Sequence, residues 1–331
     1  MREGRRTWLS DMKAVILNAS NCNPGDLSWD DYAFTLPDLA IYSNTDTKEE
    51  NLRRIKGCEI ILAPETFLSR EMLETVPELR YIGCLSTGYN MVDIEYCRER
   101  GIAVTNIPAY GTEMVSQYAI ALLLEICCQV WQHSKSVHEG KWAASGRHIF
   151  WESPVIELAG KTAGIIGFGR IGRQTARTLQ AIGMNVLYSD TFRQESEESA
   201  SCRYASLDGI YQESSVIFLH CPLVPETRGL INKESISRMK DGVILINNAR
   251  GPLIVSEDLA EALKSGKVLA AGLDVVDPEP IPDGHPLLSA PNCFITPHIS
   301  WVAKESRARL MRIGWENLTA FLGGRRQNRV D

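Results

Sequence analysis

Three side chains of complementary chemistry each follow a short apolar run in the second half of the chain. Arg250 comes after VILINNA, Glu279 lies in DVVDPEP after VLAAGLDV, and His298 ends FITPH. An arginine fork can hold both oxygens of a carboxylate, and an imidazole with its usual pKa of about 6.5 can give up a proton near neutrality. A carboxylate bonded to that imidazole would orient it and favour its protonated form. Together, the three could bind a small acid and protonate an oxygen on it.

Each of these residues, taken alone, has an ordinary structural explanation. A lone histidine is most often a satisfied core residue, and single arginines and glutamates usually lie on the surface. All three, however, have the same relation to the predicted strands, because each lies at or just beyond the end of a strand-like run. Open α/β sheets bind ligands at this carboxyl edge, and charge buried there needs partners or a ligand. We therefore interpret Arg250, Glu279 and His298 as one catalytic set.

The sequence GFGRIG at 167–172 matches the GxGxxG pattern of dinucleotide-binding turns. It follows the apolar run TAGII and opens a helix-compatible stretch. Gly167 would permit the tight turn, Gly169 would let the backbone approach a pyrophosphate, and Gly172 would let helix and strand pack closely. The free N–H groups at the start of the helix would face the phosphates. The cofactor contacts predicted here are Gly167, Gly169, Arg170, Ile171 and Gly172.

Asp190 ends the next apolar run, NVLYSD, 23 residues after Gly167. In this position an aspartate would accept hydrogen bonds from both hydroxyls of the adenosine ribose and would repel a 2′-phosphate, which favours NAD over NADP. Arg193 lies close in sequence and could offset that repulsion, so partial use of NADP stays open. A glycine turn followed by a solvated aspartate is the alternative interpretation.

The runs that precede these residues alternate with helix-compatible stretches, which predicts βαβ units and parallel sheets. Because 331 residues exceed what one core usually serves, we expect two domains. The first set of strands lies at 13–18, 59–64, 79–86 and 101–107. The second set lies at 162–169, 185–190, 215–220, 242–249, 268–275 and 293–299.

Helical stretches join and follow these strands. Residues 112–137 lack Gly and Pro and predict one long, buried helix that connects the domains, followed by a loop to about residue 153. Residues 300–324 predict an amphipathic helix capped by Gly323 and Gly324, which we expect to return to the first domain. The ending GGRRQNRVD is expected to be a solvated tail, and residues 1–11 a frayed or tag-like extension.

Composition excludes several classes of protein. A net charge of −6 argues against a nucleic-acid partner, and a hydrophobic share of 44% argues against disorder. The nine cysteines show no metal-ligand spacing, so we expect no metal site and reduced thiols typical of the cytoplasm. No apolar run reaches the roughly 20 residues that span a membrane, and the first residues lack the apolar stretch of a signal peptide.

The motifs resemble the D-isomer-specific 2-hydroxyacid dehydrogenase family, most closely its glycerate dehydrogenase or hydroxypyruvate reductase branch. The resemblance covers almost the whole chain. The segments that carry it are STGYNMVD (86–93), AYGTEMVSQYAIALLLEI (109–126), ELAGKTAGIIGFGRIG (157–172), HCPL (220–223), NNARGPLIVSEDLAEAL (247–263), GLDVVDPEP (272–280) and TPHIS (296–300).

The resemblance implies a fold, a reaction and further site residues. The fold is α/β with two domains: a Rossmann-type doubly wound parallel sheet (109–299) inserted into a discontinuous flavodoxin-like substrate domain (12–108 and 300–331), with substrate bound between them. The reaction is the reversible, NAD-dependent reduction of a small 2-oxo acid, such as hydroxypyruvate or glyoxylate, to the D-2-hydroxy acid by a homodimer. The implied cofactor contacts are Thr112, His220, Cys221, Pro222, Ala249 and Asp274, the last of them to the nicotinamide carboxamide. The implied substrate contacts are Ser86, Thr87, Gly88, Arg250, His298 and Trp301.

Some features leave alternatives open. Trp301 stands where a small residue is common, which resembles the glycerate-type branch and favours a short substrate. Trp142 and Trp151 flank a loop that could reach a neighbouring subunit. Formate dehydrogenases resemble this fold but carry glutamine where Glu279 stands. An NADH-sensing, corepressor-like binding protein can keep the same three polar residues, so the motifs alone do not exclude it.

Overall fold

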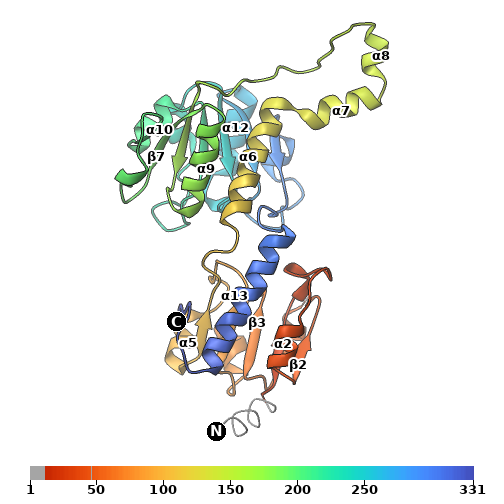
Figure 1. The fold of residues 1–331 in the computed structure, drawn as a ribbon, viewed down its shortest axis with the longest axis vertical. Coiled ribbons are helices and arrows are strands. Elements are labelled where there is room, and N and C mark those ends of the chain that lie inside the picture. The colour runs from red at the N-terminus through yellow and green to blue at the C-terminus, as the bar shows by residue number, and fades with distance from the viewer. Residues whose placement is uncertain (1–11, 46) are drawn as a thin grey trace. The chain divides into compact units, whose positions relative to one another are not determined.

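The computed structural model describes residues 12–45 and 47–331, which form two compact units. One unit runs to Gly111 and resumes at Val302–Asp331; the other is Thr112–Trp301. The boundaries expected from sequence, after residues 108 and 299, fall slightly earlier in the chain. The proposed extension at 1–11 lies outside the described residues. Figure 1 shows both units as layers of helices around strands.

The first unit contains, among the described residues, a parallel sheet with the strand order β2-β1-β3-β4-β5. This is the flavodoxin-like order. The strands are β1 (Ala14–Ile16), β2 (Leu39–Ile41), β3 (Ile60–Ala63), β4 (Tyr81–Cys84) and β5 (Ala103–Thr105). The sequence analysis did not predict β2, a partly exposed edge strand whose apolar run, Leu39–Ile41, is only three residues long.

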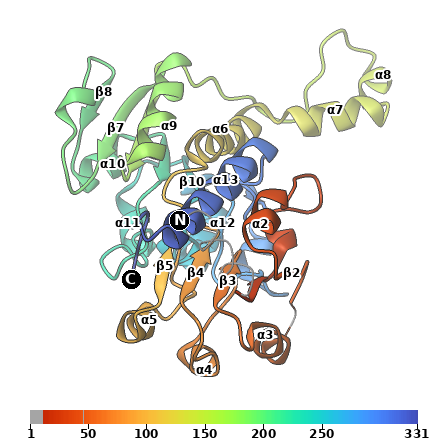
Figure 2. The ribbon, with the colours of Figure 1, turned by 60° about the horizontal axis from the view of Figure 1, so that its bottom comes forward.

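Helices cover both faces of this sheet. They are α2 (Asp30–Thr35), α3 (Lys48–Ile55), α4 (Arg70–Glu74), α5 (Ile94–Arg100) and α13 (Lys304–Leu322). Figure 2 shows α3, α4 and α5 on one side, and α2 and α13 on the other. The close approach of α13 requires Gly314, since a Cβ there would lie 2.5 Å from both Leu85 Cδ2 and the Tyr32 hydroxyl. The predicted C-terminal helix thus exists and packs on the first unit.

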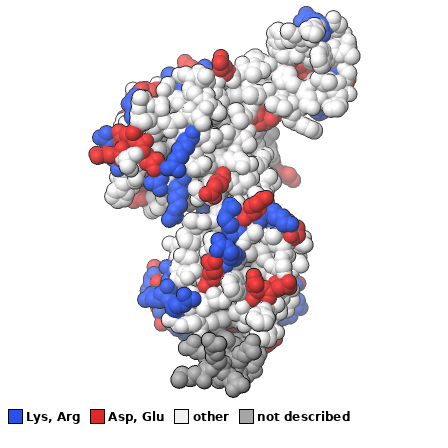
Figure 3. Space-filling model, viewed as in Figure 1, with Lys and Arg blue, Asp and Glu red and all other residues white. Residues whose placement is uncertain are grey.

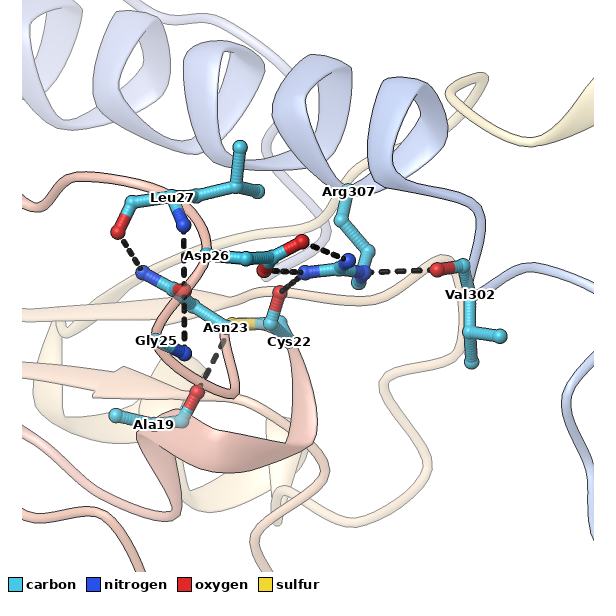
Figure 4. A network of polar contacts seen from close by, with 8 residues as sticks. All are labelled: Ala19, Cys22, Asn23, Gly25, Asp26, Leu27, Val302 and Arg307. Carbon is cyan, nitrogen blue, oxygen red and sulfur yellow. Dashed lines mark hydrogen bonds and ion pairs between the residues drawn. The ribbon is translucent and has the colours of Figure 1, made fainter.

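An arginine network fixes the start of α13 to the loop after β1 (Figure 4). The Arg307 guanidinium donates to both carboxylate oxygens of Asp26 at 2.7 and 2.8 Å, and to the carbonyls of Cys22 and Val302. Bidentate pairing of this kind is the strong form of an ion pair. The bond to Arg307 lowers the pKa of the Asp26 carboxyl. The network therefore holds Val302, the first residue after the second unit, in place on the first.

The prediction of a solvated C-terminal tail is wrong. The N–H of Val330 donates to the Val104 carbonyl, and the Asp331 carboxylate accepts from the Val104 N–H and from Arg329. An antiparallel bridge joins Arg329 to Thr105. The last residues of the tail lie against β5 because an edge strand offers unpaired backbone groups, and Arg329 is paired with Asp331, whereas Arg325 and Arg326 are exposed as predicted.

The second unit holds, within its described residues, a parallel sheet with the order β12-β11-β10-β9-β6-β7-β8, a doubly wound arrangement. The strands are β6 (Thr162–Ile166), β7 (Asn185–Ser189), β8 (Cys202–Tyr204), β9 (Val216–Leu219), β10 (Val243–Asn247), β11 (Val268–Leu273) and β12 (Cys293–Ile295). Six of these match the predicted strands. The missing strand, β8, is a short edge strand with two exposed residues, so it shows no apolar pattern.

Two apolar clusters lie on opposite faces of this sheet. One packs under α6 (Thr112–Cys128) and α9 (Arg170–Ala181). The other packs under α10 (Leu207–Glu213), α11 (Lys233–Arg238) and α12 (Ser256–Ser265). Neighbouring residues of the central strands alternate between the clusters, as Phe218 and Leu219 do. Because both faces are covered, the strands are continuous apolar runs, which made them predictable.

The predicted single helix over 112–137 is wrong in one respect. It breaks at Gln129, whose φ is +48°, into α6 and α7 (Val130–His138), which are bent by 53°. A short helix, α8 (Lys141–Ser145), follows within the predicted loop. No Gly or Pro marks the break, which is why sequence did not reveal it. In the described part of the chain no single helix is long and apolar enough to cross a membrane; α6 and α7 meet that test only as a bent pair.

Candidate active site

The three candidate catalytic residues follow three adjacent parallel strands. β10 pairs with β11, and β11 pairs with β12, so that Asn247, Leu273 and Ile295 form one row at the carboxyl edge. Arg250, Glu279 and His298 lie in the segments that leave this row. Carboxyl ends of adjacent parallel strands meet at one edge, so sheet order alone brings these segments together.

His298 and Glu279 are in direct contact. The Nδ1 atom of His298 lies 2.8 Å from Oε2 of Glu279, and the two side chains are 34% and 37% exposed. Burial raises the pKa of the Glu279 carboxyl, but the hydrogen bond and charge of His298, the Val276 N–H and the charge of Arg250 outweigh it and leave the pKa lowered. The carboxylate is therefore ionised at neutral pH and holds the ring by one nitrogen.

The backbone of His298 is in the left-handed region, with φ of +57°. Non-glycine residues seldom adopt this conformation, and it persists only where the surroundings enforce it. Asp274 supplies that restraint. Its carbonyl accepts from the His298 N–H at 2.9 Å, and its carboxylate accepts from Thr296 Oγ1 at 2.6 Å, Ile299 N at 2.9 Å and Ser300 N at 2.7 Å.

This positioning role of Asp274 was missed from sequence, which assigned the residue to the cofactor. Its side chain is 1% exposed, and its carboxylate ties together the turn that carries His298. An aspartate directly after a buried strand was the available signal. The contact with the nicotinamide carboxamide stays a prediction.

The Arg250 turn is built by its neighbours. The Asn247 side chain donates to the Arg250 carbonyl at 2.9 Å and accepts from the Ala249 N–H at 3.1 Å. Gly251 packs so closely against the next loop that a Cβ there would lie 1.9 Å from the Val276 carbonyl oxygen. The Arg250 side chain is exposed, and one of its nitrogens donates to the Ala249 carbonyl. Its influence on Glu279 is electrostatic.

The glycine loop has the shape that a dinucleotide needs. A Cβ on Gly167, where φ is +95°, would lie 2.4 Å from Cys221 N, and a Cβ on Gly172 would lie 2.2 Å from the Gly167 carbonyl oxygen. Gly169 has no atom within 4 Å of its Cβ position and caps α9 without a side chain. The start of α9 therefore has open space at Gly169 and no side-chain cap on its first N–H groups, which fits a pyrophosphate at the helix N-terminus.

Asp190 directly follows β7, next to this loop. One oxygen of its carboxylate accepts from the Phe168 N–H at 2.5 Å, and the other accepts from Thr191 Oγ1 at 3.1 Å. Phe168 stacks on Tyr188 with ring centroids 3.9 Å apart. The carboxylate is therefore held at the mouth of the glycine turn, where a ribose attached to the pyrophosphate would lie.

His220 and Cys221 line the other side of that turn. Burial lowers the pKa of His220 to about 4, and its Nε2 lies 3.1 Å from Thr175 Oγ1, so the ring is neutral; its contact with the cofactor stays a prediction. Burial raises the pKa of the Cys221 thiol to about 11, which makes it a poor nucleophile. Pro222 is exposed.

The remaining predicted residues are spread over both units. Thr112 begins α6, Ala249 precedes Arg250, and Trp301 ends the second unit. In the first unit, Ser86–Gly88 form an ordered turn after β4: Thr87 Oγ1 donates to the Ile107 carbonyl and Ser86 Oγ to that of Gly88. Their contacts with substrate stay predictions.

Comparison with known proteins identifies the class to which this fold and site belong. Residues 120–300 match the family model "D-isomer specific 2-hydroxyacid dehydrogenase, NAD binding domain". The chain is 52% identical to the hydroxypyruvate reductase of Blautia hydrogenotrophica over 97% of its own length and 100% of that protein. It is 36% identical to the glycerate dehydrogenase of Methylorubrum extorquens over 88% and 91% of the two chains.

Solved structures agree with the sequence relatives. A D-lactate dehydrogenase from Aquifex aeolicus, crystallised with NAD and lactic acid, superposes with a TM-score of 0.80 at 32% identity, covering 94% of this chain and 96% of that one. The chain therefore belongs to the D-isomer-specific 2-hydroxyacid dehydrogenases. It is an NAD-dependent oxidoreductase of that family, as the sequence predicted.

Proposed function

We propose that the enzyme reduces hydroxypyruvate, with glyoxylate as a second substrate, to the D-2-hydroxy acid, and that Arg250, Glu279 and His298 carry the reaction. The observation that carries the proposal is the 2.8 Å pair between His298 and Glu279 at the carboxyl edge of the sheet. The relatives named hydroxypyruvate reductase and glycerate dehydrogenase support the choice of substrate.

The proposed roles follow from the chemistry of each group. Arg250 binds the substrate carboxylate through its fork. NADH, bound along the glycine loop, supplies a hydride to carbon 2. His298 donates the proton that the carbonyl oxygen needs as the hydride arrives, and Glu279 holds the ring and stabilises its charged form. The products are the hydroxy acid and NAD⁺, and the reverse reaction uses neutral His298 as the base.

The test compares Arg250→Ala and His298→Ala with the unchanged protein, using hydroxypyruvate, glyoxylate, pyruvate and formate with NADH. Arg250→Ala should lose about 2 to 5 kcal/mol of transition-state binding, and His298→Ala should cut turnover roughly 100- to 10,000-fold. NADH affinity, measured by fluorescence, should hardly change. Binding of NADH without turnover of any acid would instead identify a cofactor-sensing protein. Turnover of formate above all other acids would overturn the substrate class.

We also propose that the protein is a homodimer, assembled through a projecting arm of the second unit. The arm comprises residues 130–155 and includes α7 and α8. Figure 1 shows it standing away from the α/β body of its unit, and Figure 3 shows few charged side chains on its visible face. It carries several large, exposed apolar side chains: Val130 (66%), Trp131 (72%), Ile149 (68%), Trp151 (65%) and Val155 (60%).

Exposed apolar side chains concentrated in one segment indicate an interface with another protein chain. The family resemblance implies that this partner is a second copy of the same chain. Light scattering after gel filtration should give twice the chain mass for the unchanged protein. Trp131→Glu combined with Trp151→Glu should give a monomer, whereas Phe192→Glu, an equally exposed aromatic outside the arm, should remain dimeric. A monomeric unchanged protein would contradict the proposal.

We propose a reducing compartment, the cytoplasm, as the location. The nine cysteines are free in the structure, and seven of them are buried. Thiol titration of protein purified without reductant and then unfolded should find all nine thiols; a lower count would contradict this location.

A further inference from the structure

The segment after Asp190 contains a cation that the reaction does not use. Arg193 lies three residues beyond Asp190, in the loop that leads from β7 to the short 3-10 helix η2 (Glu195–Glu197). A cation beside the adenosine ribose is what an enzyme needs in order to accept a 2′-phosphate. From sequence, Arg193 therefore counted against strict use of NAD.

The structure gives this arginine a partner. Arg193 Nε and Nη2 donate to the two carboxylate oxygens of Glu198 at 2.7 and 2.9 Å. Glu198 also accepts from the Tyr188 hydroxyl at 3.0 Å, and that hydroxyl accepts from the Gln194 N–H at 2.9 Å. The pairing raises the pKa of Arg193 and lowers that of Glu198, so both groups are charged at every pH at which the enzyme would work.

The pair is anchored to the cofactor loop rather than free on the surface. The Glu198 side chain is 20% exposed, whereas Arg193 is 56% exposed. Tyr188, which holds Glu198, is fully buried and stacks on Phe168 of the glycine loop at an interplanar angle of 14°. Glu198 thus has a fixed position, and the long arginine side chain is bound to it.

Two neighbouring arginines form ion pairs with Glu197, the residue before Glu198. Arg177 lies 3.2 Å and Arg173 lies 4.0 Å from Glu197. Glu197 and Glu198 are consecutive, but they hold arginines from different elements: Glu197 those of α9, and Glu198 that of the loop after Asp190. Substitutions at Glu197 and Glu198 therefore form a matched pair of variants, because each releases a different set of arginines.

We propose that Glu198 is a cofactor-selectivity residue, which holds the fork of Arg193 away from a 2′-phosphate so that the repulsion from Asp190 is not offset. The Glu198 carboxylate occupies the Nε–Nη2 edge of the guanidinium and balances its charge, so Arg193 is fixed in place and offers a phosphate little net attraction. To bind a 2′-phosphate through this edge, Arg193 would have to leave Glu198, whose charge would then lie near the incoming phosphate. The proposal rests on the cofactor site at the glycine loop and Asp190.

The experiment measures the dissociation constants of NADPH and NADH by fluorescence for Glu198→Gln, Glu198→Ala and the control Glu197→Gln. Each of the glutamine variants removes one negative charge from the same segment, but only that at Glu198 releases Arg193. Glu198→Gln and Glu198→Ala should bind NADPH roughly 10-fold more tightly, since one charge-assisted interaction is gained. NADH binding should stay within about 2-fold in every variant.

A double variant identifies the route of the effect. Adding Arg193→Ala to Glu198→Gln should return NADPH affinity to that of the unchanged protein. The proposal is overturned if neither Glu198 variant changes the NADPH to NADH ratio, if Glu197→Gln changes it equally, or if the double variant keeps the gain. If the unchanged protein does not bind NADH at all, the cofactor site itself is refuted.

Discussion

Gly251→Ala should damage the active site without touching any group that reacts. Gly251 follows Arg250 and packs against the backbone of the loop that carries Glu279. A Cβ built on it lies 1.9 Å from the Val276 carbonyl oxygen, 2.1 Å from the Val276 carbonyl carbon and 2.8 Å from Asp277 N. These neighbours are backbone atoms, so no side chain can rotate away to make room.

The size of the effect follows from that contact. Because Cβ atoms essentially never come within 3.0 Å of such neighbours, the two loops must separate by about 1.1 Å, the difference between 3.0 and 1.9 Å. Arg250 moves with one loop and Glu279 with the other. A misplacement of about 1 Å in a catalytic constellation costs on the order of 100-fold in rate. We therefore expect kcat/KM for hydroxypyruvate to fall by roughly 100-fold.

The assay follows NADH absorbance during hydroxypyruvate reduction, together with the dissociation constant of NADH and the thermal midpoint. Gly209→Ala is the matched control. Gly209 lies in α10, and its added Cβ would have Ala205 Cβ as its nearest neighbour at an ordinary 3.4 Å. That variant should keep full activity and gain up to about 1 kcal/mol of stability from the better helix former.

Two results would refute the reasoning. A Gly251→Ala enzyme with nearly normal kcat/KM would show that the spacing of the Arg250 and Glu279 loops does not matter to the reaction. Equal losses in the two alanine variants would show a general effect of removing glycine rather than a specific clash.

Three further predictions concern the carboxylates. Glu279→Gln removes the charge that holds His298, so the alkaline limb of kcat/KM for reduction should move roughly one pH unit lower. Because folding lowers the Glu279 pKa, the ionised side chain stabilises the fold at pH values above its unfolded-state pKa, and this contribution is lost as the pH falls through the folded-state pKa. The difference in urea midpoint between the unchanged protein and this variant should therefore shrink below about pH 4. A constant difference would contradict the pairing of an ionised Glu279 with His298. Asp274→Asn replaces one carboxylate oxygen with an amide N–H2 group and so turns a donor towards the donors of Thr296, Ile299 or Ser300. We therefore expect kcat to fall roughly 10- to 100-fold with NADH affinity nearly kept, and the opposite pattern would assign Asp274 to the cofactor instead. Asp26→Asn weakens the pair with Arg307, so the thermal midpoint should drop at pH 7. The drop should vanish in acid, because Asp26 of the unchanged protein then takes up its proton. A drop that persists at pH 2 would exclude the ion pair as its cause.

The sequence predicted every strand except two short ones, β2 and β8, each of which lies at an edge of its sheet. Strands such as Val216–Leu219 and Val243–Asn247 are uninterrupted apolar runs, because helices cover both sides of a parallel sheet. Leu39–Ile41 is apolar but only three residues long, and Cys202–Tyr204 has two exposed residues, one of them an arginine, so neither gives a clear strand pattern. The break at Gln129 depends on where α6 leaves the core, which is a tertiary property without a local signal.

The site shows the same division between local pattern and spatial arrangement. Strand ends located Arg250, Glu279 and His298, and the glycine pattern located the dinucleotide turn. The left-handed backbone of His298 and the three donors on the Asp274 carboxylate depend on the packing of one loop against another, so no spacing rule could show them. The pairing of Arg193 with Glu198 was likewise hidden, since the two residues flank Gln194 and the short helix η2 and follow no regular helix or strand spacing.

The arrangement at the carboxyl edge also explains how so many polar groups tolerate partial burial. Each carboxylate there is compensated before any ligand binds: Asp274 by one hydroxyl and two backbone N–H groups, Glu279 by His298 and the Val276 N–H, and Asp190 by the Phe168 N–H and Thr191. Arg250 differs, because its side chain is exposed and its guanidinium donates to the carbonyl of the neighbouring Ala249. A carboxylate substrate is thus the partner that this guanidinium fits best. In the proposed reaction the fold pre-positions these protein groups, and the substrate carboxylate would supply the charge that Arg250 binds.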